Sequence, residues 1–428
     1  MKKGNEIRRW IILGFMISLA FSCDTENSIA PPEDSYFKKY YGGEGDQEGV
    51  DMVVNSDGSF LLFGTTRNPT RTSQLYLVKA DARGKVMWEK TFGGVFDEEA
   101  RDIELTRNGN IVIVGNTKTV DGDRDILIMT LSPEGVKIDS SGYSLNSALI
   151  KLDEGANSVT ETNDGFIIAG YTTNITKKPT APTPANDKRD AIYVRYYSNL
   201  QSYPPTWNPV NDSPGTFDQA VKIMEIENNN NNFYFFGSSN SETPLFSSIQ
   251  SWVFALGSGG TQNGGKIHFG LPSSNVINKE AVTVPNGNGF VMIGSSIDAS
   301  GDSSIYLAKL RNPGSTIGSD DIEFQKTFAS TGNLTGVSIY PSRDFRYLIL
   351  GNQREGNGNS DIFFSRLEPN LDPYAEPKTF GGSCEDTAGA VTELPDGSIM
   401  IIGTIRTGDE CESKMALFKL NKEGKFEK

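Results

Sequence analysis

Cysteine and histidine are the scarcest reactive residues of this 428-residue chain, which contains three cysteines and one histidine. The single histidine, His268, has no companion motif, so we expect neither a Ser–His–Asp triad nor a histidine-based metal site. Acidic side chains are plentiful, and a pair of carboxylates for glycoside chemistry stays open. Because no pattern singles out two of them, the sequence predicts no catalytic residue and no metal ligand.

Cys23 follows the parts of an export signal. Four basic residues precede Trp10, and an apolar run of about a dozen residues then reaches Phe21, whereas a membrane-spanning helix needs about 20. The segment Ala20-Phe21-Ser22-Cys23 resembles the lipobox of bacterial lipoproteins, although that motif usually has Leu where Ala20 stands, and Phe21 is bulky. The resemblance implies cleavage after Ser22 and covalent lipid on Cys23. The alternative is an ordinary cleaved signal beside an incidental cysteine.

Lipid on Cys23 would hold the protein on a membrane, since each buried acyl CH₂ contributes about 0.8 kcal/mol. The polar, acidic residues 24–27 resemble the surface-export signal of Bacteroidetes lipoproteins, which implies an outer-membrane protein exposed on the cell surface. Pro31-Pro32 lies in a segment expected to act as a spacer. We therefore predict a signal peptide over residues 1–22 and a lipidated tether over residues 23–35.

The charge of the chain limits its partners. The formal net charge is −14, and the first 22 residues carry a net +3, so the remaining chain is near −17. Such a surface repels nucleic acid, and we expect no nucleic-acid partner. We expect a monomer with no cofactor other than the lipid on Cys23, and a protein or glycan ligand that the sequence does not identify.

A repeat runs through the rest of the chain. An apolar run that ends in glycine, as in Phe60 to Gly64, occurs seven times at intervals of 51 to 67 residues. Turn sequences such as Ser56-Asp57-Gly58 precede the run, and further apolar runs follow it, so each unit holds four short strands. The repeated glycines are Gly64, Gly115, Gly170, Gly237, Gly294, Gly351 and Gly403.

Four strands at this period predict an all-β fold, a seven-bladed β-propeller of four-stranded antiparallel blades over residues 36–428. A solenoid and a two-sheet sandwich are the alternatives. A small residue near the start of each first strand is expected where the blades crowd together. Residues 36–43 have the form of a fourth strand with no blade before it, so we expect them to complete the seventh blade. The small residues are Gly49, Ala100, Ala156, Ala220, Ala281, Gly336 and Ala388.

The units resemble the bacterial β-propeller repeat families whose units contain Gly-Gly, Asp, Asp-Gly and Gly-x-Thr. Units 1, 2 and 7 match well, and units 3 and 4 match poorly. The segment from Asp81 to Trp88 is similar to a unit of quinoprotein propellers, but it occurs clearly once. These resemblances imply the fold and no shared reaction.

Two loops of the seventh unit carry Cys384 and Cys411, and the strand order of a blade places these loops side by side on one face. A disulfide is therefore geometrically reasonable, and it would stabilise the chain by about 3 kcal/mol. Two free, buried thiols are the alternative.

Four acids precede the small residues and are expected on the same face as these loops. They are Glu48, Glu99, Glu154 and Glu280. Around a channel mouth they could attract a cation or a basic partner, whereas in the alternative they only suit tight turns and keep the loops solvated. We expect a non-enzymatic module that binds a ligand, glycan or protein. A carbohydrate-active enzyme and a structural accessory of an envelope complex remain the alternatives.

Overall fold

The computed structural model describes residues 36–68, 72–145, 152–173, 189–203, 210–211, 217–225, 233–240, 248–257, 262–285, 287, 289–311, 317–328, 332–356 and 358–426. The predicted lipid site Cys23, with the signal peptide and the tether, lies outside these residues. Within them, no helix is long and apolar enough to cross a membrane.

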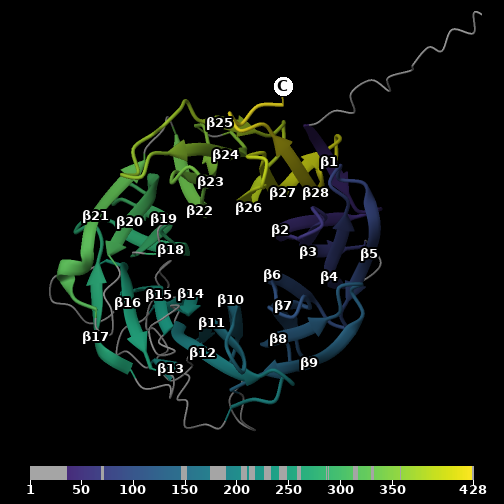
Figure 1. Ribbon diagram of the computed structural model, residues 1–428, viewed down its shortest axis with the longest axis horizontal. Coiled ribbons are helices and arrows are strands. Elements are labelled where there is room, and N and C mark those ends of the chain that lie inside the picture. The colour runs from purple at the N-terminus through teal and green to yellow at the C-terminus, as the bar shows by residue number, and fades with distance from the viewer. Residues whose placement is uncertain are drawn as a thin grey trace, which may run out of the picture.

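Seven four-stranded antiparallel sheets are arranged around a common axis, which confirms the predicted seven-bladed propeller (Figure 1). Blade 1 contains β2 (Asp46–Val54), β3 (Phe60–Arg67), β4 (Ser73–Ala80) and β5 (Val86–Phe92). Blade 2 contains β6 (Glu98–Leu105), β7 (Ile111–Lys118), β8 (Arg124–Leu131) and β9 (Lys137–Tyr143). Blade 3 contains β10 (Glu154–Glu161), β11 (Gly165–Thr173), β12 (Arg189–Tyr197) and β13 (Val210–Asn211).

The remaining blades follow the same order. Blade 4 contains β14 (Asp218–Glu225), β15 (Phe233–Ser239), β16 (Gln250–Leu256) and β17 (Gln262–Phe269). Blade 5 contains β18 (Asn275–Thr283), β19 (Gly289–Ile297), β20 (Ser303–Arg311) and β21 (Ile322–Phe328), and the short helix η3 (Ser319–Asp321) precedes β21. Blade 6 contains β22 (Asn333–Pro341), β23 (Tyr347–Arg354), β24 (Ser360–Leu367) and β25 (Lys378–Phe380). Blade 7 contains β26 (Thr387–Glu393), β27 (Ile399–Thr407), β28 (Glu412–Leu420) and, from the start of the chain, β1 (Phe37–Tyr41).

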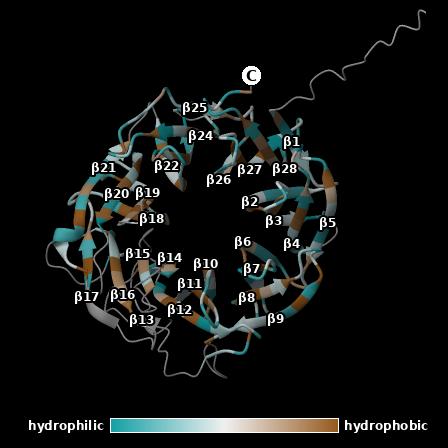
Figure 2. Ribbon diagram, in the orientation of Figure 1, coloured by the Kyte–Doolittle hydropathy of each residue, from teal (hydrophilic) through white to brown (hydrophobic). Residues whose placement is uncertain are grey.

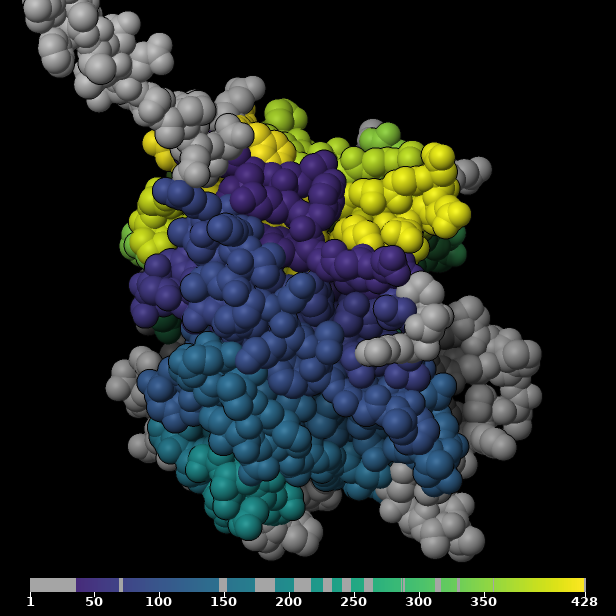
Figure 3. All heavy atoms as spheres, turned by 90° about the vertical axis from the view of Figure 1, so that its right-hand side faces the viewer, coloured from purple at the N-terminus to yellow at the C-terminus, as the bar shows by residue number. Residues whose placement is uncertain are grey.

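The ring closes as the sequence predicts. Strand β1 pairs with β28 over five residues, from Phe37 opposite Lys419 to Tyr41 opposite Met415. The N-terminal residues in purple lie directly against the C-terminal residues in yellow (Figure 3). Closure pairs an edge that would otherwise stay exposed, without any covalent link between the ends of the chain.

The hydrophobic core is divided among the junctions between blades. Seven clusters of buried side chains are found, and each joins two neighbouring blades, including the pair formed by blades 7 and 1. Figure 2 shows the hydrophobic stretches along the strands. Each blade is apolar on both faces because neighbours cover both, which explains why the second and third strands are continuous apolar runs.

The repeated glycine has a steric reason. A Cβ on Gly64 would lie 1.7 Å from the carbonyl oxygen of Glu48 on the first strand of the same blade. The predicted crowding of small residues also holds, since a Cβ on Gly49 would lie 2.5 Å from the carbonyl oxygen of Gly403 in the preceding blade. Neither position has room for a larger side chain.

Candidate functional site

Every first strand contains an irregularity at the same place. In β2 the pairing with β3 runs to Gly49 opposite Gly64 and resumes at Asp51 opposite Phe63, so Val50 is left unpaired as a β-bulge. The bulge residues of blades 1 to 7 are Val50, Arg101, Asn157, Val221, Lys279, Val337 and Gly389. The next residue of each strand is, in the same order, Asp51, Asp102, Ser158, Lys222, Glu280, Ser338 and Ala390. Bulges re-aim side chains, and here they give the axis two residues from each blade.

All fourteen of these residues line one polar cavity of about 470 Å³ on the axis of the ring, which we call the axial channel. The first strands that carry them are the innermost strands of the blades (Figure 1). The bulge layer contains two cations and no acid, whereas the following layer contains three acids and Lys222. The two layers therefore differ in the sign of their charge.

The acids of the second layer connect neighbouring blades. Oxygens of Asp51, Asp102 and Glu280 accept backbone N–H groups at 3.2, 2.8 and 2.9 Å, and each N–H belongs to the first strand of the next blade. Burial raises the pKa of Asp51 well above its usual range, and the negative charge and hydrogen bond of Asp102 add to this. Burial likewise raises the pKa of Glu280. Their first role is to hold blades together.

Lys222 neutralises part of this acidic layer. Its ammonium lies 3.8 Å from a carboxylate oxygen of Asp102 and 3.8 Å from one of Glu104. Burial alone would lower the pKa of Lys222, but the charges of Asp102, Glu104, Glu280 and Asp51 raise it. Burial raises the pKa of Glu104 to about 7, against the opposing effect of Lys222. The acids and the lysine thus form one interacting group of charges.

Cations gather at one end of the axial channel, around the starts of the first and third strands. Arg101, Arg189 and Lys279 all line the cavity there. The Arg101 guanidinium is 2.8 Å from Glu99, and that of Arg189 lies 4.0 Å from the ring centre of Tyr171. The Lys279 side chain is exposed within the cavity, yet its pKa is lowered, first by desolvation there and then by the positive charges of Arg101 and Arg189.

Tyr171 interrupts a hydrogen bond that recurs around the ring. At six junctions between blades, the side-chain oxygen of the residue that follows the repeated glycine accepts a hydrogen bond. The donor is a backbone N–H in the next blade, from the residue just before the bulge. The acceptors are Thr65, Asn116, Ser238, Ser295, Asn352 and Thr404, at 2.8 to 3.2 Å. In blade 3 this position is Tyr171, whose ring occupies the space beside Gly155 and lines the axial channel. Blade 3 therefore contributes an aromatic wall to the channel.

A second cavity of about 390 Å³ lies on the same face, among blades 7, 1 and 2. Glu48 and Arg124 line both cavities. Glu99 lies between two cations, with oxygens 2.8 Å from Arg101 and 3.7 Å from Arg124. The channel mouth thus continues into a groove in which acids and bases alternate.

The structure separates the four acids that the sequence groups at the rim. Glu48 and Glu99 line the groove at the mouth. Glu154 is fully buried, accepts hydrogen bonds from the Thr172 hydroxyl at 2.6 Å and the Leu145 N–H at 3.2 Å, and has a pKa raised by burial to about 7. Glu280 lies in the acidic layer inside the channel.

The position of Glu280 corrects one assignment. The repeat pattern predicts Ala281 as the small residue of blade 5, but the pairing places Asn278 opposite Gly294, and Ala281 opposite Met292. Asn278 fits because its amide donates to the Gly237 carbonyl at 2.7 Å in the preceding blade. The prediction was wrong because it took Val284 as the inward apolar residue of the first strand and placed the small residue three positions before it, whereas β18 already ends at Thr283.

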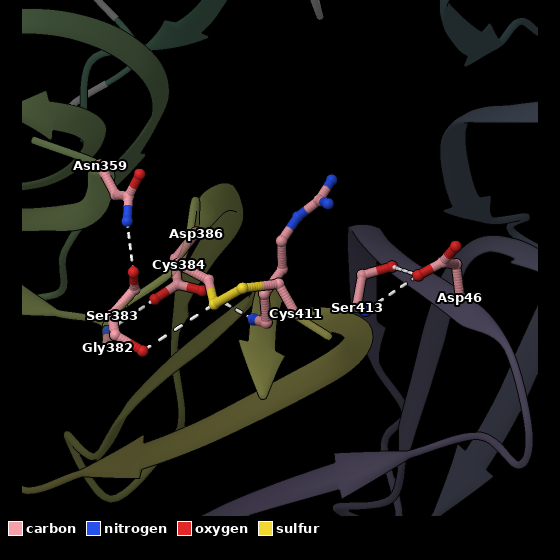
Figure 4. The surroundings of a disulfide bond; sticks show 9 residues. Asp46, Asn359, Gly382, Ser383, Cys384, Asp386, Cys411 and Ser413 are labelled. Carbon is pink, nitrogen blue, oxygen red and sulfur yellow. Dashed lines mark hydrogen bonds between the residues drawn. A yellow bond between two sulfur atoms is a disulfide. The ribbon is translucent and has the colours of Figure 1, made fainter. Parts of the chain in front are cut away.

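The predicted disulfide is confirmed, and it joins Cys384 to Cys411 with Cα atoms 5.9 Å apart (Figure 4). Next to it, Asp386 accepts the N–H groups of Gly382 at 2.8 Å and Arg406 at 2.7 Å. The bridge and these bonds fix the two loops of blade 7 beside the channel mouth.

Three groups of residues that the sequence analysis did not single out contribute to the channel: the bulge cations Arg101 and Lys279, the strand-start cation Arg189, and Tyr171. A signal for Tyr171 was present, because it follows the repeated glycine where most units have Thr, Ser or Asn. Within the described part of the chain, no group of three or more His, Cys, Asp or Glu side chains is arranged to hold a metal ion.

Comparisons with known proteins bear on the fold alone. No family model matches the chain, and no curated protein matches it. Among solved structures, the periplasmic gluconolactonase of Pseudomonas aeruginosa is similar at 10% identity with a TM-score of 0.52, over 85% of this chain and 97% of that one. A puromycin hydrolase is similar at 10% identity and a TM-score of 0.52, over 87% of this chain and 53% of that one. An α-L-arabinofuranosidase of Fusarium graminearum gives a TM-score of 0.48 at 10% identity, over 92% of this chain and 99% of that one. The similarity to the gluconolactonase and the puromycin hydrolase shows a shared fold.

Proposed function

We propose that this chain is a lipid-anchored surface protein whose propeller binds a ligand at the open end of the axial channel. The observation that supports this best is the channel mouth itself, a polar cavity whose walls carry Arg101, Arg189, Lys279 and Tyr171. Ligand sites are concave and have a few convergent polar groups, and in this chain the residues that depart from the repeat converge on one cavity.

The path of the chain supports an anchor on the other side of the ring. Phe37 begins β1 opposite Lys419, near the end of β28, whereas the channel mouth lies at the starts of the first and third strands. A tether that ends at residue 35 therefore reaches the propeller on the face opposite the mouth. Lipid on Cys23 would leave the mouth directed away from the outer membrane, toward a protein or glycan ligand outside the cell.

Blocking the channel tests the binding role. Val337 is a half-buried bulge residue on the channel wall, and Val86 lies 43% exposed on the outer strand β5. The intact protein should retain a partner from its own membrane or a glycan on an array, and Val337→Trp should lose this binding. Val86→Trp serves as the matched control and should bind normally. Equal binding by both variants would place the ligand elsewhere.

The anchor is tested separately. Cys23→Ala should release the protein from the membrane fraction and abolish incorporation of labelled palmitate, because no acyl chain can then attach. Continued tight association with the membrane would reject lipidation of this cysteine.

A carboxylate-dependent carbohydrate-active enzyme is the second candidate, and the hydrogen-bonded carboxyls of Asp51 and Asp102 in the channel favour it. A buried carboxyl whose pKa is raised, as at Asp51, can act as a general acid. Release of new reducing ends from polysaccharides, lost in Asp51→Asn, would support this candidate. The blade-to-blade bonds that both acids make give them a structural role without it.

A further inference from the structure

We propose that the channel mouth is an oxyanion site, in which Lys279, Arg101 and Arg189 bind a carboxylate, phosphate or sulfate group of the ligand. This inference rests on the proposed binding function and specifies the chemical class of the ligand.

One donor at the channel mouth lacks an acceptor. The Nε of Arg101 is shielded from solvent and has no hydrogen-bond acceptor among the residues that the structure describes. Buried polar groups in proteins are normally satisfied, so a buried donor left without an acceptor in a cavity indicates a missing partner. Lys279 lines the same cavity and is exposed there, where a ligand can reach its ammonium.

The three cations line one cavity. Arg101 and Lys279 occupy the bulge position of blades 2 and 5, and Arg189 begins β12 of blade 3. Desolvation, and then the charges of both arginines, lower the pKa of Lys279, as expected for cations that share a cavity. Like charges placed together in a cavity disfavour one another unless an anion joins them.

Most acids near the mouth already have partners. Asp51, Asp102 and Glu280 accept backbone N–H groups of the next blade, and Lys222 lies among them. Glu99 pairs with Arg101 through one oxygen and approaches Arg124 with the other. Cations outnumber acids among the described residues of the mouth, where Arg101, Arg124, Arg189 and Lys279 lie with Glu48 and Glu99, although the chain as a whole carries −14.

The geometry suits an oxyanion. Arginine offers a planar fork of N–H donors that matches carboxylate and phosphate oxygens, and lysine adds a compact charge. Arg189 is held by stacking on Tyr171, with its guanidinium 4.0 Å from the ring centre, so its orientation is fixed before binding. A preorganised donor loses little freedom when the anion arrives.

Calorimetric titration of the intact protein in detergent tests this inference with inorganic phosphate, sulfate and galacturonate, and with galactose as the neutral probe. We expect at least one anion to bind and galactose to bind at least about tenfold more weakly. Lys279→Met should weaken anion binding about tenfold or more, and Lys279→Arg should restore it. Lys422→Met is the matched control at an exposed site, 75% accessible, and should leave binding unchanged.

The pH profile adds a readout that a structural role of Lys279 would not change. Affinity for the anion should fall in alkaline solution as Lys279 loses its proton, at a lower pH than for an ordinary lysine. Lys279→Arg should remove that fall, because arginine stays charged.

Three results would overturn the oxyanion site. They are equal binding of galactose and the anions, unchanged anion affinity in Lys279→Met with a normal melting temperature, and no anion binding at all. Retention of a neutral glycan, lost in Val337→Trp and unaffected by Lys279→Met, would reject the oxyanion site and leave the proposed binding function in place. If Lys279→Met fails to fold, Arg101→Met replaces it and should show the same tenfold loss.

Discussion

The closing seam between blades 7 and 1 and the channel wall of blades 2, 3 and 5 are built from the same repeat and differ in how they use it. At the seam the repeat is followed: Gly49 donates to Thr404 at 3.1 Å, and Ser413 donates to Asp46 at 3.0 Å. On the channel wall, Tyr171 and Lys279 depart from it. The seam residues that follow the repeat hold the ring together, whereas Tyr171 and Lys279 line the channel, where a ligand can reach them.

The largest effect should follow from removing the seam. Deleting residues 36–43 removes β1 and the buried Tyr41, and it exposes the edge of β28. We expect a loss of about 4 kcal/mol in the free energy of unfolding, comparable to the loss of a large core side chain. Urea denaturation measures it. An unchanged midpoint would show that the last residues of the chain close the ring instead.

Loss of the disulfide should come next. Replacing Cys384 and Cys411, which are 27 positions apart, with serine frees the chain between them and should cost about 3 kcal/mol. The bridge lies in blade 7, away from Lys279, so anion binding at the channel should persist. Denaturation of the oxidised wild type, of the same protein with reductant and of the double variant gives the comparison. Stability that is indifferent to reductant would contradict it.

A smaller loss should follow from crowding the repeat. Gly64→Ala places a Cβ 1.7 Å from the Glu48 carbonyl, and overpacking of this kind costs about 2 kcal/mol. Gly43→Ala is the control, because nothing lies within 4 Å of its Cβ position. Thermal unfolding should separate the two variants. Equal melting temperatures would mean that the bulge relaxes at little cost.

The smallest effects concern the pH dependence of the free energy of unfolding. The sign of this dependence differs between the channel wall, where Glu104 contributes, and the seam, where Asp46 contributes. Burial raises the pKa of Glu104 to about 7, so the folded chain binds more protons than the unfolded chain between about pH 4.5 and 7. Its contribution is therefore present in acid and lost as the pH rises through 7. Glu104→Gln should remove this decline, about 1 kcal/mol after allowance for its contact with water.

The seam behaves in the opposite way. The backbone N–H of Ser413 lowers the pKa of Asp46, so its contribution is present near neutral pH and lost as the pH falls through the lowered pKa. Asp46→Asn should flatten the acid limb of the stability curve and leave the neutral limb unchanged. Denaturation curves across this pH range check both variants, and identical profiles for the two would contradict the difference.

The sequence predicts the ring well and the channel poorly, for a physical reason. The repeated glycine and the apolar runs report close packing within and between blades, which recurs seven times and so is visible as a pattern. The bulge at Val50 and its equivalents depends on where the pairing of two strands skips a residue, which the apolar pattern does not report. In blade 5, taking Ala281 as the small residue shifts the register of the first strand and so conceals that Lys279 is the bulge residue. The rim acids show the same limit, because Glu154 and Glu280 fit the acid pattern but lie buried and inside the channel, respectively.

The seam also sets an order of events in folding. Six blades are each built from neighbouring segments, whereas the seventh joins β1 to strands that follow all six, and Asp46 and Ser413, which link blades 1 and 7, are 367 positions apart. Contacts of such separation form slowly. Until they form, β1 is an unpaired edge strand, the kind of segment that a chaperone or a second chain meets first.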